Sequence, residues 1–102
     1  MAFISGNHLA VAVDTPERLT TLLAGSSYSW ANLTLDPLAT GPARWGGPTV
    51  SNATQIGNPI NPGETVLVAS GSGPNTHHTG ETYLAFSGNA AGDNIAWTVC
   101  KS

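Results

Sequence analysis

The side chains with the widest chemical repertoire are three histidines, one cysteine and six carboxylates. His77 and His78 are adjacent in a polar segment, residues 70–80. Adjacent residues of a strand point to opposite faces, so these histidines would need a third ligand to hold a metal ion. Three other residues could supply it, although no spacing selects among them: Cys100, Glu81 and Asp93. We interpret both histidines as solvated loop residues and expect neither a metal site nor a cofactor.

Nucleophilic and acid–base catalysis also lack a motif. The chain has no Gly-x-Ser-x-Gly sequence, which would place a serine on a sharp turn between strand and helix. The glycine-rich segment 70–74 lacks the lysine and the following helix of a phosphate-binding loop. Asp14 and Glu17 are close in sequence, but the start of a helix explains them better. Cys100 is interpreted as a small apolar residue of the last strand. We therefore expect no enzymatic activity.

Aromatic side chains offer a different chemistry, because they stack on sugar rings or anchor protein interfaces. Trp30 and Trp97 are predicted to lie in the core or at subunit contacts, where aromatic residues are enriched. Trp45 follows Arg44 among glycines and prolines. Of the three tryptophans, it is the one that we expect to be partly exposed.

The composition excludes several classes of protein. The chain has 102 residues, which suits one domain, and 40% of them are hydrophobic, enough for a modest core. Only three residues are basic and the net charge is −3, which argues against a nucleic-acid partner. No apolar run approaches the roughly 18 residues of a membrane span. Charged residues make up only 9% of the chain, so few surface charges oppose association with other proteins. We therefore expect other subunits to cover this surface.

The elements that must position these residues are predicted to be strands. Twelve glycines and seven prolines make turns dense, and short alternating or apolar runs lie between them. The predicted strands are residues 8–13, 28–36, 43–45, 49–51, 64–69, 82–86 and 95–99, with the last two forming a hairpin. We expect a double turn over residues 58–63 and a long exposed loop over residues 70–80.

One helix is expected near the N-terminus. Thr15 can cap it, Pro16 suits its first position, and Glu17 suits the positive end of its dipole. Leucines at positions 19, 22 and 23 fall at helical spacing, and Gly25 would end the helix. The predicted fold is all-β: a small antiparallel β-sandwich or jelly-roll-like barrel, in one domain over residues 1–102, with this short helix.

The first residues leave two alternatives open. Residues 1–13 have no basic region, and Gly6 to His8 interrupts their apolar stretch, so we expect no signal peptide. Residues 1–7, which include Phe3 and Ile4, could form an arm that docks on a neighbour as an added strand. Alternatively, they form the first strand of the chain's own sheet.

Residues 43–68 carry a resemblance to a known group of proteins. They read A-R-W-G-G-P-T-V-S, then G-N-P-I-N-P-G-E-T-V-L-V, and are followed by Thr82-Tyr83-Leu84-Ala85-Phe86 and a Gly-Asp turn. This order resembles small bacteriophage virion proteins with a Gly-x-x-Leu-x-Pro-Gly-Glu turn and a late pair of strands. Thr40-Gly41-Pro42 replaces their Asn-x-Gly turn, and residues 44–47 replace their Val-Tyr-Val-Gly strand.

The resemblance implies a non-enzymatic phage structural protein, most concretely a capsid decoration (cement) protein. Such a protein would be made in the bacterial host cytoplasm, reside in the virion and clamp the major capsid protein or other virion proteins, often as a trimer. Neither nucleic acid nor a membrane is an expected partner. The candidate contact residues are Phe3, Ile4, Arg44, Trp45, Asn75, His77 and His78.

An alternative is a receptor- or carbohydrate-binding module of a phage tail or head fibre. Trp45, Asn75 and the two loop histidines, His77 and His78, would then line a shallow site. A third possibility is a cupin-like metalloprotein on a similar barrel, against which the adjacent histidines argue.

Overall fold

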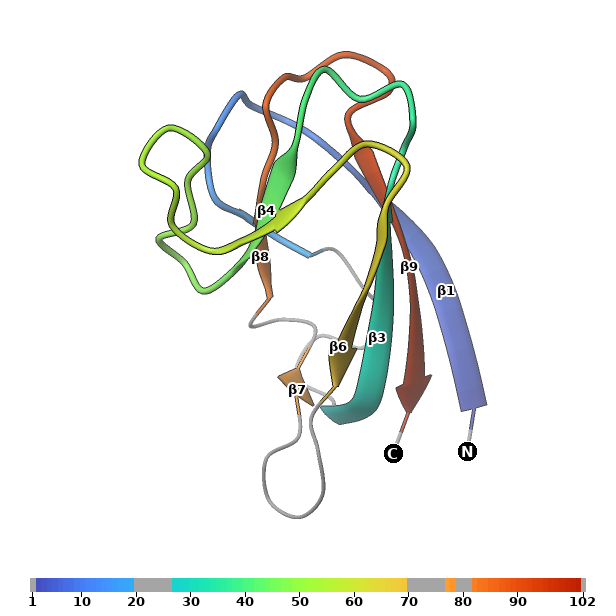
Figure 1. Ribbon diagram of the computed structural model, residues 1–102. Helices are drawn as coiled ribbons and strands as arrows, with labels where there is room; N and C mark the ends of the chain where they lie inside the picture. Colours follow the sequence, from blue (N-terminus) through green and yellow to red (C-terminus); the bar gives the residue numbers. More distant parts are fainter. Residues whose placement is uncertain (1, 20–26, 70–76, 79–81, 102) are drawn as a thin grey trace.

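The structure is a computed structural model that describes residues 2–19, 27–69, 77–78 and 82–101. All regular elements in these ranges are β-strands (Figure 1). They are β1 (Ala2–Leu9), β2 (Glu17–Arg18), β3 (Ser27–Leu35), β4 (Ala43–Gly46), β5 (Asn58–Ile60), β6 (Thr65–Ala69), β7 (His77–His78), β8 (Tyr83–Ala85) and β9 (Asn94–Lys101).

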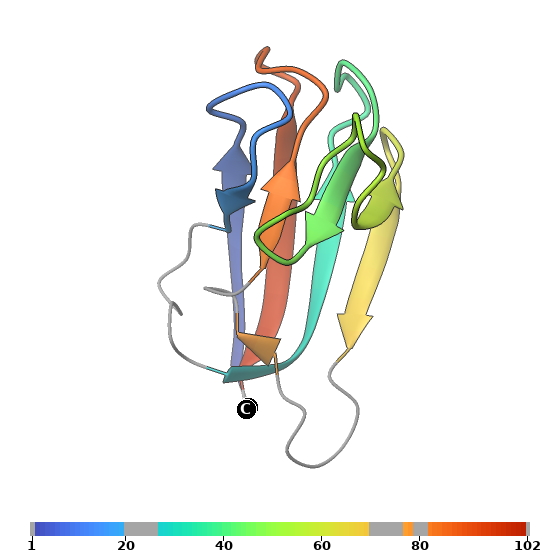
Figure 2. The ribbon, with the colours of Figure 1, turned by 90° about the vertical axis from the view of Figure 1, so that its left-hand side faces the viewer.

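The strands form two antiparallel sheets. The first sheet has the order β1-β9-β3-β6, and β7 also pairs with β3. The second sheet has the order β2-β8-β4-β5. The two sheets lie face to face, as the perpendicular views of Figures 1 and 2 show, so the predicted all-β class is confirmed and a β-sandwich is compatible with the arrangement.

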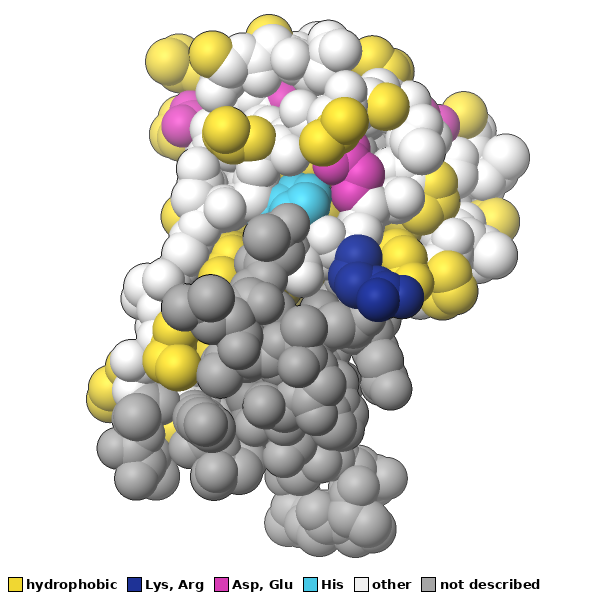
Figure 3. All heavy atoms as spheres, turned by 180° about the vertical axis from the view of Figure 1, so that it is seen from behind, with side chains coloured by type: hydrophobic (Ala, Val, Ile, Leu, Met, Phe, Trp, Pro, Cys, Tyr) yellow, Lys and Arg dark blue, Asp and Glu magenta, His cyan; other side chains and the backbone are white. Residues whose placement is uncertain are grey.

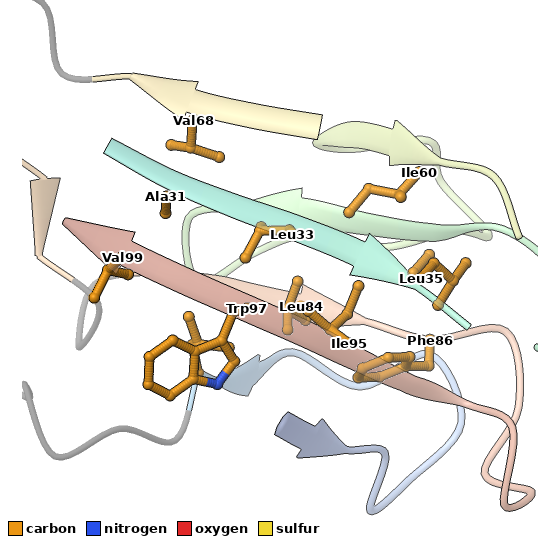
Figure 4. Packing of buried hydrophobic residues seen from close by; sticks show 12 residues of the cluster. Ala31, Leu33, Leu35, Ile60, Val68, Leu84, Phe86, Ile95, Trp97 and Val99 are labelled. Carbon is orange, nitrogen blue, oxygen red and sulfur yellow. The ribbon is translucent and has the colours of Figure 1, made fainter. Parts of the chain in front are cut away.

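The core lies between the sheets and follows from alternation along each strand. In β3, Leu33 and Leu35 are fully buried, whereas the alternate residues Asn32 and Thr34 are only partly buried. Figure 4 shows how side chains from both sheets meet in this layer. The first sheet contributes Ala31, Leu33, Leu35, Val68, Ile95, Trp97 and Val99. The second sheet contributes Ala43, Ile60 and Leu84, together with Leu19 and Phe86, which directly follow β2 and β8.

The predicted N-terminal helix is wrong. Glu17 and Arg18 form β2, which pairs with Leu84 and Tyr83 of β8. Leu19, which the helical spacing used, is buried in the core. The remainder of the expected helix, residues 20–26, lies outside the described part of the chain. The helix signal failed because an acidic residue after Thr-Pro also suits a loop with unpaired N–H groups.

The predicted hairpin between the last two strands is also wrong. β8 pairs with β2 and β4 in the second sheet, whereas β9 pairs with β1 and β3 in the first. The segment between them therefore crosses from one sheet to the other. Of the double turn predicted over residues 58–63, residues 58–60 instead form the edge strand β5. The strands β3, β4 and β6 lie where the sequence predicted strands.

Residues 2–7 belong to the first strand of the chain's own sheet, the second of the two alternatives. β1 pairs with β9 without a register shift, from Ala2 opposite Lys101 to Leu9 opposite Asn94. Gly6 is required within this strand because the Trp97 indole lies over it. A Cβ at this position would lie 2.7 Å from Cε2 of that ring, closer than van der Waals contact allows.

Candidate functional site

The outward side of the first sheet is a surface built of uncharged side chains. We call this surface, formed by the outward-pointing side chains of β1, β9, β3 and β6, the outer face. Because opposite residues of an antiparallel ladder share a side, the strand registers align these side chains in rows. The three rows are Phe3–Cys100–Trp30, Ser5–Thr98–Asn32–Leu67 and Asn7–Ala96–Thr34–Thr65.

An aromatic pair stands at one end of the outer face. The rings of Phe3 and Trp30 have centroids 5.6 Å apart and planes inclined by 49°. Cys100 lies between them in the same row and is only 1% exposed. Phe3 itself is 66% exposed, and Leu67 at the opposite edge of the sheet is 62% exposed. The exposed Phe3 beside a second aromatic ring offers apolar area that a partner could cover.

Hydroxyl pairs bridge neighbouring strands on the same face. Ser5 Oγ and Thr98 Oγ1 lie 2.8 Å apart, and Thr34 Oγ1 and Thr65 Oγ1 lie 2.7 Å apart. These pairs hold neighbouring side chains of the sheet in fixed positions and keep acceptor capacity directed outward. The outer face therefore combines an apolar row at one end with two neutral, mainly polar rows that can exchange hydrogen bonds.

The described arginines lie on the second sheet instead. Arg18 Nη2 donates to the Tyr83 hydroxyl at 2.9 Å, and its guanidinium lies 5.6 Å from the centroid of that ring. Arg44 Nη1 donates to the carbonyl of Gly57 at 2.7 Å. Figure 3 shows one group of basic side chains on the side of the molecule that it presents. The two sheets thus expose chemically different surfaces.

The described carboxylates accept hydrogen bonds from turns and loops. Asp14, Glu17, Asp36, Glu64 and Asp93 each accept at least one backbone N–H from a non-strand segment. Such N–H groups lack a ladder partner, and leaving them buried and unpaired would be costly. These carboxylates therefore act as structural acceptors.

Asp93 is the most enclosed of these carboxylates, at 1% exposure. It accepts hydrogen bonds from the N–H and hydroxyl of Thr40, at 2.9 and 2.7 Å, and from the N–H of Ala90 at 3.0 Å. Burial alone would raise the pKa of the Asp93 carboxyl, but these three hydrogen bonds together lower it. The charged group fastens the segment before β4 to the crossing between β8 and β9.

Two further acidic residues anchor loops beside the second sheet. Asp14 accepts from the N–H groups of Asn52 and Ala53 and from the Ser51 hydroxyl, and the Asn52 N–H bond is the main cause of its lowered pKa. Glu17 accepts from the N–H groups of residues 11 and 12.

The sequence did not predict the contacts of the His8 side chain. It lies on the inward side of β1 and is 6% exposed. Its Nε2 is 3.2 Å from Glu17 Oε1, and its ring stacks on Phe86 with centroids 6.0 Å apart. The histidine thereby links the edge of the first sheet to the second.

The predicted contact residues divide between the two sheets. Phe3 lies on the outer face, and Ile4 is partly buried against the core. The backbone of His77 and His78 pairs with Tyr28 and Ser27, at the end of the first sheet where Phe3 lies.

Arg44 and Trp45 belong to β4 of the second sheet, and Trp45 packs against the core. The loop prediction is wrong at His77 and His78, which form β7 of the first sheet and are therefore not in the same sheet as Trp45. Asn75 lies outside the described residues. Leu67 was not among the predicted contact residues. Trp30 was predicted to lie in the core or at a subunit contact, and the alternation along residues 28–36 already separates it from Leu33 and Leu35.

No group of three or more His, Cys, Asp or Glu among the described residues is arranged to hold a metal ion. In the same part of the chain, no helix has the length and apolar character needed to cross a membrane. Comparison of the chain with protein-family models, curated proteins and solved structures finds no match.

Proposed function

We propose that this chain is a structural protein of a phage particle, a capsid decoration protein that binds the assembled coat through the outer face. The observation that carries the proposal is the neutral composition of that face across four strands, with Phe3 and Leu67 left in water at its edges. The phage assignment itself rests on the sequence resemblance.

The function would be static. A sheet face with an apolar row at one end can pack on a coat subunit, and burial of its apolar area favours association. The neutral polar rows exchange hydrogen bonds without the desolvation cost of buried charges. A particle that contains the protein would then resist dissociation better, because a ligand that binds only the assembled state stabilises that state by mass action.

The test is quantitative mass spectrometry of purified particles from the source. A copy number close to that of the major coat protein is expected. Absence of the chain from the particles would overturn the proposal. A few copies per particle would favour a tail or fibre location instead.

A matched pair of variants tests the face itself. Asn32→Lys places a charge at the centre of the outer face, and Pro59→Lys places one on the opposite sheet, where Pro59 is exposed in β5. The first variant should lower occupancy on particles at least tenfold, since a buried unpaired charge is costly. The second should leave occupancy unchanged, and the reverse pattern would assign binding to the second sheet.

A second candidate function is a carbohydrate-binding module, which the pair of exposed Phe3 and half-buried Trp30 beside hydroxyl and amide side chains favours. Aromatic rings of this kind stack on sugars. Glycan-array binding that is lost in Trp30→Ala, with the fold retained by circular dichroism, would support this function. Loss of glycan binding in Trp45→Ala is less informative because Trp45 packs against the core.

A further inference from the structure

The outer edge of the first sheet is a long strand, and part of its lateral hydrogen-bonding groups have no partner among the described residues. β1 has eight residues, pairs with β9 on one side and lies at the end of the sheet order (Figure 1). It contains no charged residue and no proline. Natural edge strands are ordinarily protected against pairing by charges, prolines, bulges or short length.

The direction of the free groups follows from the ladder. The Ala10 N–H donates to the Asp93 carbonyl at 2.9 Å, at the position that continues the β1–β9 register by one pair. Antiparallel pairs alternate between hydrogen-bonded and non-hydrogen-bonded, so even-numbered residues of β1 bond to β9. The N–H and C=O groups of Phe3, Ser5 and Asn7 therefore point away from the sheet. Within the described structure these groups bond to no other segment.

The other edges are protected or shorter. β2 consists of two charged residues, and β5 has three residues that include Pro59. β6 has five residues, against eight in β1. An edge strand that binds its own copy about a two-fold axis closes the assembly, whereas pairing of β1 with β6 of another copy would leave an open chain of molecules.

We infer that a second copy of this chain binds along β1, antiparallel, with the two-fold axis at Ser5. Ser5 then faces Ser5 of the second copy, and Phe3 faces its Asn7. These pairs use the groups that are free, and they form about six hydrogen bonds between the chains. The two outer faces become one continuous sheet surface. The inference does not depend on the proposed function.

The inward side chains are self-complementary in this register. Ile4 of each copy faces Gly6 of the other, in a pair of the closely spaced, non-hydrogen-bonded type. Gly6 has no side chain, and the Trp97 ring lies over it from the neighbouring strand. The half-buried Ile4 would thus lie beside that ring in the second copy. A second copy also brings no charge to this strand, so no repulsion opposes the pairing.

The experiment is size-exclusion chromatography with light scattering on the full chain. Wild type should have about twice the 10.4 kDa mass of one chain. Ser5→Lys and Ser5→Glu should each have the mass of one chain, since like charges placed directly opposite destabilise a strand pair. An equimolar mixture of the two variants should restore the doubled mass. Ser5 is exposed, so both variants should retain the wild-type circular dichroism spectrum.

Thr65→Lys is the matched control, because it places the same charge on an exposed, outward position of the other edge strand. It should leave the dimer intact. A wild-type monomer at all concentrations, a mass of three chains, or dissociation by Thr65→Lys in place of Ser5→Lys would overturn the inference. Single variants that dissociate without rescue in the mixture would exclude the two-fold axis at Ser5.

Discussion

At Asp93, burial and hydrogen bonding act on the carboxyl group in opposite directions. Burial favours the neutral form, while three donors from Thr40 and Ala90 favour the charged form and lower the pKa. Gly88 belongs to the same arrangement, because a Cβ there would lie 2.8 Å from Asp93 Oδ2. The site thus combines a charge, its donors and a glycine that leaves room for them.

Acid should destabilise the fold through Asp14 and Asp93. Both have a folded pKa below the ordinary value of 3.8, which the unfolded chain retains. Their contribution to stability is therefore present above about pH 3.8 and is lost as the pH falls through the lower, folded pKa values. Urea unfolding at a series of pH values should show a decline below pH 3.8. Asp93→Asn should show a shallower decline, and an unchanged pH profile would contradict the role of this carboxylate.

Gly6→Ala should destabilise the chain by about 1–3 kcal/mol, because the added methyl overlaps the Trp97 ring and forces it to move. Gly47→Ala is the matched control, since a Cβ there meets nothing within 4 Å. Thermal unfolding followed by tryptophan fluorescence measures both effects. Equal melting temperatures for the two variants would show that the indole is not fixed over Gly6.

At the scale of elements, the alternation of apolar and polar side chains predicted where strands lie. It did not predict which strands pair with one another. The pattern in residues 28–36 correctly separated Leu33 and Leu35 from Asn32 and Thr34. The contact between Phe3 and Trp30 was not predictable. It depends on the last strand, β9, lying between β1 and β3 in the sheet. Local patterns carry no information on which sheet a strand joins, which is also why the hairpin prediction failed.

The failed helix prediction has a specific physical cause. A carboxylate at Glu17 was expected to meet the free N–H groups of a helix start. It instead meets the free N–H groups of Val11 and Ala12 in the preceding loop. The same interaction serves two structures, so the Thr-Pro-Glu signal cannot distinguish them.

Glu17→Gln should therefore loosen the loop between β1 and β2. The amide has one acceptor oxygen in place of two and no charge, so the hydrogen bonds to Val11 and Ala12 weaken. Hydrogen exchange at these two amides should accelerate about tenfold, which corresponds to roughly 1.4 kcal/mol, one hydrogen bond's contribution.

Glu64→Gln provides the control, because Glu64 accepts from Asn61 in a different turn. This variant should accelerate exchange at Asn61 and leave the loop between β1 and β2 unchanged. Acceleration at residues 11 and 12 in both variants would indicate a general loss of stability.

At the scale of the whole molecule, the rows of the outer face are neutral, whereas the described arginines lie on the second sheet. The outer face of the first sheet has Ser, Thr, Asn and apolar side chains along its described rows, whereas Arg18 and Arg44 lie on the second sheet. A binding surface without charges needs no counterion exchange. Salt dependence therefore distinguishes the two sheets without any mutation.

Binding to particles should be nearly independent of sodium chloride if the outer face mediates it. Raising ionic strength from 0.01 to about 1 M shortens the Debye length from about 30 to about 3 Å, which screens exposed charge pairs but leaves apolar burial in place. Sulfate should strengthen the binding, because it favours apolar burial. Co-sedimentation with particles at both salt concentrations measures this directly. A steep loss of binding in sodium chloride would assign the contact to the arginine-bearing sheet, since charged contacts are the ones that salt weakens.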